Sequence, residues 1–149
     1  TAVNPACTRR IRRQISQLGL ANRVILHGVL QDDALKEKML SSHLLVVPSQ
    51  YEGFGIVYLE GMGFGLPAIG GQDGGAREII RDGVNGWLVA GGDTAVLSQH
   101  IRHLHQNRAC LTEMSLAARQ HFLTQPTWQE SMAKIRRFQK EMANENDHR

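Results

Sequence analysis

Aromatic residues are scarce in this sequence: Phe, Trp and Tyr make up 5% of the 149 residues. Proteins that bind single-stranded nucleic acid stack successive bases on such rings, so the composition argues against that class. The two cysteines, Cys7 and Cys110, form neither a CxxC motif nor a Cys/His ligand spacing. We interpret both as reduced structural thiols, because disulfide frameworks and zinc sites need more ligands at set spacings.

Long hydrophobic runs are also missing. No stretch of about 18 apolar residues is present to cross a bilayer. Residues 1–6 lack the basic-then-apolar layout of a signal peptide. The sequence therefore predicts a cytoplasmic protein. Because the chain starts with Thr1, we expect a processed product, an excised domain or part of a longer chain.

Apart from these absences, the composition is that of an ordered globular protein. A hydrophobic content of 42% in 149 residues allows one domain with a real core, or half of a larger enzyme. The net charge is only +3, and two helical segments hold many of the basic residues: Arg9, Arg10, Arg12, Arg13, and Lys134, Arg136, Arg137, Lys140. Solvated helix faces are the simpler explanation of these clusters, and peripheral contact with the inner face of a membrane is the alternative.

Hydrophobic spacing predicts alternating helices and strands in the first two thirds of the chain. Residues 7–19 read as an amphipathic helix that stops at Gly19, and residues 32–41 as a helix opened by Asp32 or Asp33. Further helices are expected over 56–64 and 76–81. Apolar runs at 24–27, 44–47, 66–69 and 86–89 are typical of buried parallel strands. Residues 94–106, 109–123 and those from 127 onward read as helix only, which makes the fold an α/β Rossmann-like sheet followed by an all-helical segment.

Glycine is concentrated in one part of the chain, since 13 of the 15 glycines lie between Gly53 and Gly92. Gly61, Gly63 and Gly65 fall inside or just after a predicted helix, where each costs roughly 1 kcal/mol relative to alanine. Either a ligand or a packed neighbouring element must come close to this helix, and the sequence leaves both explanations open.

The segment Glu52-Gly-Phe-Gly-Ile-Val-Tyr-Leu-Glu60 places two carboxylates eight residues apart. A strand that ends at Val47 brings the chain to the carboxyl edge of a parallel sheet, where open α/β folds bind ligands. If a helix starts near Gly55 or Ile56, its first amides have no intrahelical acceptor and lie at the positive end of the helix dipole. Such amides suit a phosphate group.

The two glutamates would lie on either side of that phosphate group. Glu60 is about one turn into the helix and leans back toward its N-terminus, where its carboxylate can accept hydrogen bonds from ribose hydroxyls. Glu52, in the preceding loop, would lie on the far side of the phosphates. The pair therefore suits a nucleoside diphosphate that carries a second sugar. Taken alone, the two glutamates are explained more simply as one helix N-terminal acid and one surface acid.

The histidines offer weaker candidates. His100, His103 and His105 resemble a metal cluster in spacing, but no Cys, Asp or Glu completes a ligand set, so we expect no metal site. His27 ends an apolar run and is interpreted as a packed strand-end residue rather than a ligand contact. Trp128 is interpreted as an anchor toward another domain rather than a sugar platform.

Several motifs occur in a recognisable order along nearly the whole chain. They are Arg23-Val-Ile-Leu-His-Gly-Val29, Pro48-Ser49, Glu52 to Glu60, Gly65-Leu-Pro67, Gly74-Gly-Ala-Arg-Glu78-Ile-Ile, Asp82-Gly-Val-Asn-Gly-Trp-Leu-Val89 and Trp128. In this order they resemble the C-terminal nucleotide-binding domain of retaining glycosyltransferases with the GT-B fold, glycosyltransferase family 4.

The resemblance implies a role for each matching position. Glu60 would bind the ribose hydroxyls, and Glu52 would lie beside the donor hexose near its reacting carbon, as the catalytic residue of this half. The loop and helix start between them would bind the donor through Gly53, Phe54, Gly55, Ile56 and Val57, with the amides of Phe54 and Gly55 on the hexose and those of Ile56 and Val57 on the diphosphate. Gly28 and Val29 would border the base, and Glu78 would order the loop at the crevice edge.

The resemblance also implies what such a protein does and what this chain leaves to other parts. Members transfer a sugar from a nucleoside diphosphate donor, here expected to be UDP- or GDP-linked, to an acceptor hydroxyl with retention and without a bound metal or other cofactor. The acceptor, whether glycan, lipid or small molecule, is held by an N-terminal domain. This sequence has no match to that N-terminal domain. It also has no match to the first two βα units of the donor-binding domain, which carry a phosphate-binding Arg and Lys. Residues 1–149 are therefore expected to be a partial donor-binding domain that is inactive alone. The alternative is a non-catalytic or truncated α/β nucleotide-binding module.

Overall fold

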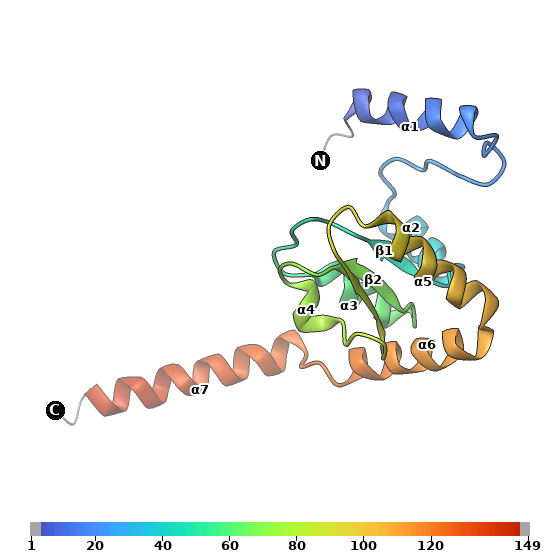
Figure 1. Ribbon diagram of the computed structural model, residues 1–149. Helices are drawn as coiled ribbons and strands as arrows, with labels where there is room; N and C mark the ends of the chain where they lie inside the picture. Colours follow the sequence, from blue (N-terminus) through green and yellow to red (C-terminus); the bar gives the residue numbers. More distant parts are fainter. Residues whose placement is uncertain (1–3, 147–149) are drawn as a thin grey trace. The chain divides into compact units, whose positions relative to one another are not determined.

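The computed structural model describes residues 4–146 and divides the chain into two compact units, Thr1–Ser41 and Ser42–Arg149. The smaller unit holds two helices and an irregular connection. The larger unit holds a parallel sheet with its helices and a helical C-terminal part (Figure 1).

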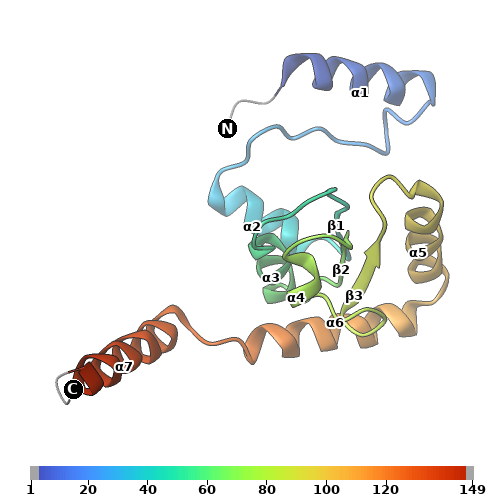
Figure 2. The ribbon, with the colours of Figure 1, turned by 60° about the vertical axis from the view of Figure 1, so that its left-hand side comes forward.

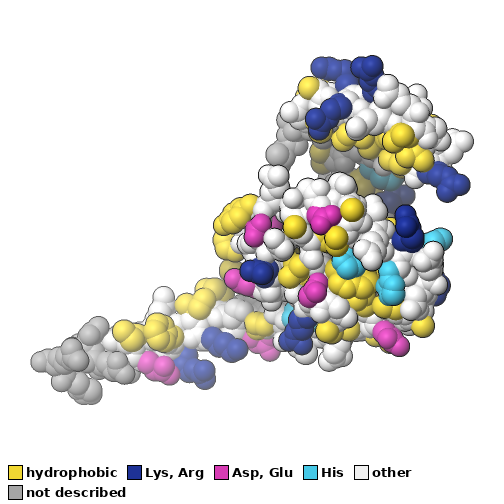
Figure 3. Space-filling view, viewed as in Figure 1, with side chains coloured by type: hydrophobic (Ala, Val, Ile, Leu, Met, Phe, Trp, Pro, Cys, Tyr) yellow, Lys and Arg dark blue, Asp and Glu magenta, His cyan; other side chains and the backbone are white. Residues whose placement is uncertain are grey.

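In the smaller unit, helix α1 (Pro5–Gln17) has a clear start and stop. The side-chain oxygen of Asn4 accepts hydrogen bonds from the amides of Ala6 and Cys7, which satisfies donors that the first helical turn leaves open. Gly19 ends the helix at a φ of +66°. There the Leu20 amide donates to the Ile15 carbonyl at 2.9 Å, the arrangement that a glycine stop produces. The predicted helix and its stop at Gly19 are confirmed. Figure 3 shows basic side chains at the surface of this part of the chain.

The prediction of a strand at residues 24–27 is wrong. Residues 24–28 are irregular and pair with no strand among the described residues. Ile25 is 73% exposed. A strand exists only through hydrogen bonds to a neighbouring strand, so an apolar run is not enough to form one. Helix α2 (Asp32–Leu40) follows as predicted, with Asp32 and Asp33 in its first turn and Gln31 at the capping position.

The larger unit contains a sheet of the strands β1 (Leu45–Val47), β2 (Ala68–Gly71) and β3 (Gly86–Val89). Both neighbouring pairs are parallel in the order β1-β2-β3. Helices α3 (Ile56–Gly63) and α4 (Ala76–Ile79) form the crossovers, so the predicted β-α-β organisation is confirmed here.

Strand β2 starts two residues later than predicted. The Leu66 amide still donates to the Gly61 carbonyl at the end of α3, and Pro67 has no amide to donate. Ladder pairing therefore starts at Ala68, opposite Leu45.

Packing of neighbouring elements explains two of the helix glycines. A Cβ on Gly61 would lie 2.7 Å from Cδ2 of Leu45 in β1, and one on Gly63 would lie 3.2 Å from the ring of Phe122. Gly65 has a φ of +76° and forms the turn after α3. Of the two explanations that the sequence left open, close packing of the helix is the one found at Gly61 and Gly63.

The rest of the larger unit is helical, as predicted. Helices α5 (Thr94–Gln106) and α6 (Arg108–Leu123) are capped by the side chains of Asp93 and Asn107. Figure 2 shows α6 below the sheet, and α6 contacts both α3 and α5. Helix α7 (Trp128–Asn146) follows, and Trp128 at its start is 80% exposed. Between residues 4 and 146, no helix has the length and apolar character needed to cross a membrane.

Candidate functional site

The loop between β1 and α3 occupies the edge of the sheet where the parallel strands end. It begins with a tight turn, in which the Ser49 amide donates back to the carbonyl of Val47 at 2.9 Å. Ligands of open α/β sheets bind at this edge. The sequence-based prediction placed Glu52 in this loop and Glu60 on the following helix, and the structure has both there.

Backbone contacts with the loop after β2 hold this loop in place. The Gly75 amide donates to the Glu52 carbonyl at 2.6 Å, and Glu52 forms a parallel bridge with Gly74. A Cβ on Gly75 would lie 2.7 Å from the carbonyl carbon of Phe54, and Cβ atoms on Gly71 and Gly74 would collide with the backbone of the same loop. Only glycine lets the two backbones approach so closely.

The start of α3 leaves backbone amides without a hydrogen-bond acceptor. Gly55 occupies the capping position with a φ of +69° and provides no side-chain acceptor. Within residues 4–146, the amides of Ile56 and Val57 have no hydrogen-bond acceptor, whereas the Tyr58 amide donates to the Gly55 carbonyl at 2.9 Å. Two free amides at the positive end of a helix form a site for an anion.

The two glutamates differ in their surroundings. Glu60 is exposed on α3, and Glu52 is partly buried. Neither forms an ion pair with any residue that the structure describes. Burial raises the pKa of Tyr58 above its usual value, the charge of Glu52 raises it further, and a hydrogen bond from the Gly71 backbone lowers it.

Two aromatic side chains on the same loop point into solvent. Tyr51 is 76% exposed and Phe54 is 82% exposed.

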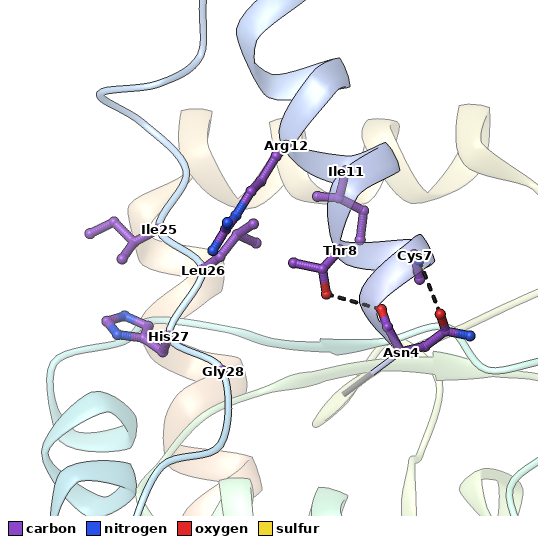
Figure 4. Close-up of a pocket in the computed structure, with 9 residues that line it drawn as sticks. All are labelled: Asn4, Cys7, Thr8, Ile11, Arg12, Ile25, Leu26, His27 and Gly28. Atoms are coloured by element: carbon purple, nitrogen blue, oxygen red, sulfur yellow. Dashed lines mark hydrogen bonds between the residues drawn. The ribbon is translucent and has the colours of Figure 1, made fainter. Parts of the chain in front are cut away.

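Gly28 and Val29, the residues predicted to border the base, belong to the smaller unit. Gly28 has a φ of +70° and lines a hollow of about 550 Å³ between α1 and residues 25–28 (Figure 4). His27 and Leu26 line the same hollow. Val29 is 69% exposed.

Sequence reasoning missed one residue beside the site and one that supports the sheet from its opposite edge. Tyr58 falls within an apolar run and reads as an ordinary core residue. Asn85 is 1% exposed and joins the end of α4 to β3: its side-chain oxygen accepts from the Arg81 amide at 2.7 Å, and its side-chain nitrogen donates to the Ile79 carbonyl at 3.2 Å. The Asp-Gly-Val-Asn-Gly turn around it was the available signal.

Other predicted residues have different surroundings from those expected. Glu78 is exposed and its side chain has no hydrogen-bond partner among the described residues, so backbone contacts through Gly74 and Gly75 order the crevice-edge loop instead. His100 stacks on Trp87 at 4.4 Å between ring centroids, and His103 meets the same ring edge-on. In the described part of the chain, no group of three or more His, Cys, Asp or Glu is arranged to hold a metal ion.

Known proteins are similar to this chain in sequence and in fold. The model of the family "Glycosyl transferases group 1" matches residues 7–121. A D-inositol 3-phosphate glycosyltransferase of Geodermatophilus obscurus is 34% identical over 113 residues, which cover 76% of this chain and 24% of that protein. The chain spans about a fifth to a quarter of the length of the curated relatives it matches first.

Solved structures agree with this match. The Anabaena protein Alr3699/HepE, in complex with UDP-glucose, is 29% identical with a TM-score of 0.71 over 77% of this chain and 31% of that one. The C-terminal domain of the group 1 glycosyl transferase LpcC from Francisella tularensis shares the fold, with 21% identity, a TM-score of 0.76 and coverage of 84% of this chain and 65% of that one. The predicted Rossmann-like fold of the C-terminal half of a GT-B protein is confirmed. Because the family match covers most of the chain, this protein belongs to the group 1 glycosyl transferases.

Proposed function

We propose that this chain is the donor-binding part of a retaining hexosyltransferase, which transfers a sugar from a nucleoside diphosphate sugar to an acceptor hydroxyl. One observation carries the proposal: the free amides of Ile56 and Val57 lie at the start of a helix, between a loop glutamate and a helix glutamate. An anion flanked by two carboxylates fits a diphosphate with a sugar at each end.

Each residue of the proposed site has a chemical task. The amides of Ile56 and Val57 stabilise the diphosphate, which gains charge as it leaves. Glu60 accepts hydrogen bonds from the ribose hydroxyls. Glu52 lies beside the hexose, where a carboxylate stabilises the positive charge that develops at the reacting carbon.

The remaining donor contacts are proposed from backbone groups. Gly53, Phe54 and Gly55 belong to the fixed loop, so the amides of Phe54 and Gly55 are held ready for hexose hydroxyls at little entropic cost. Gly28 and Val29 would border the base. The Anabaena neighbour was solved with UDP-glucose, which supports a uridine-linked donor; a guanosine-linked one is the alternative.

The whole reaction needs groups beyond this site. We propose that cations for the diphosphate and the acceptor site, for a glycan, lipid or small molecule, come from the longer protein of which this chain is the donor-binding part. The chain alone would then bind donor without transferring sugar. The proposed chemistry uses oriented amides and no metal or other cofactor, takes place in the cytoplasm, and is compatible with a peripheral position at the membrane.

Donor binding can be measured directly on this chain. We expect calorimetric or NMR titration with UDP, GDP and ADP and their glucose conjugates to show one preferred base. Glu60→Ala should weaken that nucleotide about tenfold, since it removes a charged acceptor for two hydroxyls. Glu113→Ala, which removes an exposed glutamate from α6, is the matched control and should bind as the parent does.

Two results would contradict the proposal. If none of these nucleotides binds below millimolar concentration, the chain has no donor site. If Glu60→Ala binds as tightly as Glu113→Ala, the helix glutamate does not hold the ribose.

A further inference from the structure

Tyr58 links the start of α3 to the end of β1. It is the third residue of α3, and its side chain is fully buried. Its hydroxyl donates a hydrogen bond to the carbonyl of Val47 at 2.8 Å. Val47 is the last residue of β1, so this bond reaches the point where the chain leaves the sheet and enters the loop that holds Glu52.

The Val47 carbonyl receives a second hydrogen bond, from the Ser49 amide at 2.9 Å. The two donors together fix the direction in which the chain leaves β1. Further along, the Glu52 carbonyl accepts from the Gly75 amide at 2.6 Å. The loop from Ser49 to Gly55 is thus tied near its start by Tyr58 and at Glu52 by Gly75.

The tyrosine ring has little freedom to move. A Cβ on Gly70 would lie 3.0 Å from its Cζ atom and 3.1 Å from its hydroxyl, and a Cβ on Gly55 would lie 3.1 Å from its Cδ2 atom. Backbone without side chains therefore borders the ring on two sides, and the hydroxyl is held at one place. In a close-packed interior, the surrounding residues shift only partly when one contact is removed.

We propose that Tyr58 is a positioning residue for the sugar end of the donor: its hydroxyl holds the Ser49–Gly55 loop, and with it the Glu52 carboxylate, in the place where the hexose binds. The proposal rests on the donor site described above. It assigns to Tyr58 an action through the loop, with no contact to the donor itself.

The proposal separates two parts of donor binding. The diphosphate meets the amides of Ile56 and Val57, which the helix places, and Tyr58→Phe keeps the buried ring that packs this helix. The hexose meets the loop, which loses one of its ties when the hydroxyl is removed. The variant should therefore weaken the contribution of the sugar while leaving that of the nucleoside diphosphate nearly unchanged.

The test compares UDP-glucose with UDP as ligands of the parent chain and of Tyr58→Phe. We expect the ratio of the two affinities to fall about fivefold in the variant, the usual effect of one lost hydrogen bond, with UDP binding within twofold of the parent. Ser115→Ala is the matched control, because it also removes a hydroxyl that donates to a backbone carbonyl: the Ser115 hydroxyl donates to the Gly65 carbonyl at 2.6 Å. Gly65 lies just before the start of β2, at the other edge of the sheet from the Ser49–Gly55 loop. Ser115→Ala should leave the ratio unchanged. An equal loss for UDP and UDP-glucose in Tyr58→Phe would show a general structural role and overturn the proposal.

A second measurement needs no ligand. In Tyr58→Phe, hydrogen exchange of the Ser49 and Gly75 amides should become about fivefold faster, while the Gln72 amide, which donates to the Val89 carbonyl, keeps its rate. Unchanged exchange at Ser49 and Gly75 would overturn the positioning role whatever the ligand does. Faster exchange in a chain that binds no nucleotide would instead refute the donor site and leave Tyr58 as the residue that holds the loop.

Discussion

Replacing Gly75 with alanine tests the backbone contact on which the whole site depends. Gly75 has a φ of −62° and a ψ of −16°, a conformation that alanine adopts without strain. The only obstacle is therefore space: the new Cβ would lie 2.7 Å from the carbonyl carbon of Phe54 and 2.9 Å from the Gly53 oxygen. Both atoms belong to backbone that is itself held in place, so neither can swing aside as a flexible side chain would.

The cost follows from two opposing effects. Forcing an extra methyl group into packed structure costs about 1–3 kcal/mol. Against this, alanine restricts the unfolded chain more than glycine does and returns about 0.4–1 kcal/mol. The net loss of unfolding free energy should be about 1–2 kcal/mol, which lowers the melting temperature by roughly 4–8 °C.

Tryptophan fluorescence during thermal unfolding measures this loss in the right part of the chain, because Trp87 and Trp128, the two tryptophans of the sequence, both lie in the unit from Ser42 onward. Gly53→Ala is the control, since a Cβ there meets no atom within 4 Å and should change stability by less than about 0.5 kcal/mol. If Gly75→Ala melts together with Gly53→Ala, the two loops are not in close contact, and the reasoning that only glycine permits their approach is wrong.

Two further predictions concern the stability of the larger unit. Asn85→Ala should lower the unfolding free energy by roughly 2–4 kcal/mol, because it leaves the Arg81 amide and the buried Ile79 carbonyl without their partner; denaturant unfolding that matches the parent would contradict this. His121 has its pKa lowered, first by burial and then by the charge of Arg81. The unfolded chain therefore binds the proton more tightly, and the stability that His121 contributes as a neutral side chain is lost as pH falls below about 6.5. Melting temperatures from pH 7 to 5 should fall less in His121→Gln than in the parent, and equal slopes would show that another group titrates.

The sequence predicted those elements whose signals are local. The stop of α1 at Gly19 and the extent of α5, predicted and found over residues 94–106, depend on a few neighbouring residues, and both were placed correctly. The apolar run at residues 24–27 was misassigned because a strand depends on a partner that the run itself does not specify. Hydrophobicity marks a segment that tends to be buried, but hydrogen bonding with a neighbour decides whether it becomes a strand.

In the site, as in the fold, the features with local sequence signals were predicted and those that depend on distant neighbours were not. The position of Glu52 in a loop and of Glu60 on a helix followed from turn and helix signals between them. The glycines of α3 indicated that some other group packs closely against this helix. They did not identify that group as Leu45, Phe122 or a ligand, because the absence of a Cβ does not specify which group fills the space. The hydrogen bond from Tyr58 to Val47 could not be predicted for a related reason. The Tyr58 ring fits the apolar pattern of a core residue, and only the fold brings its hydroxyl to the Val47 carbonyl.

The way the loop is held has a consequence for specificity. Its backbone is fixed by glycines in the opposite turn and by the Gly75 amide, while the side chains of Tyr51 and Phe54 take no part in these contacts and extend into solvent. A site organised in this way separates two requirements, since the free amides at the start of α3 need the fixed backbone, whereas the outward side chains can vary without loss of the fold. Chains with the same glycines can therefore present the same pair of free amides beside different outward side chains. If those amides bind the diphosphate as proposed, the side chains that face the sugar can change while the diphosphate site stays the same.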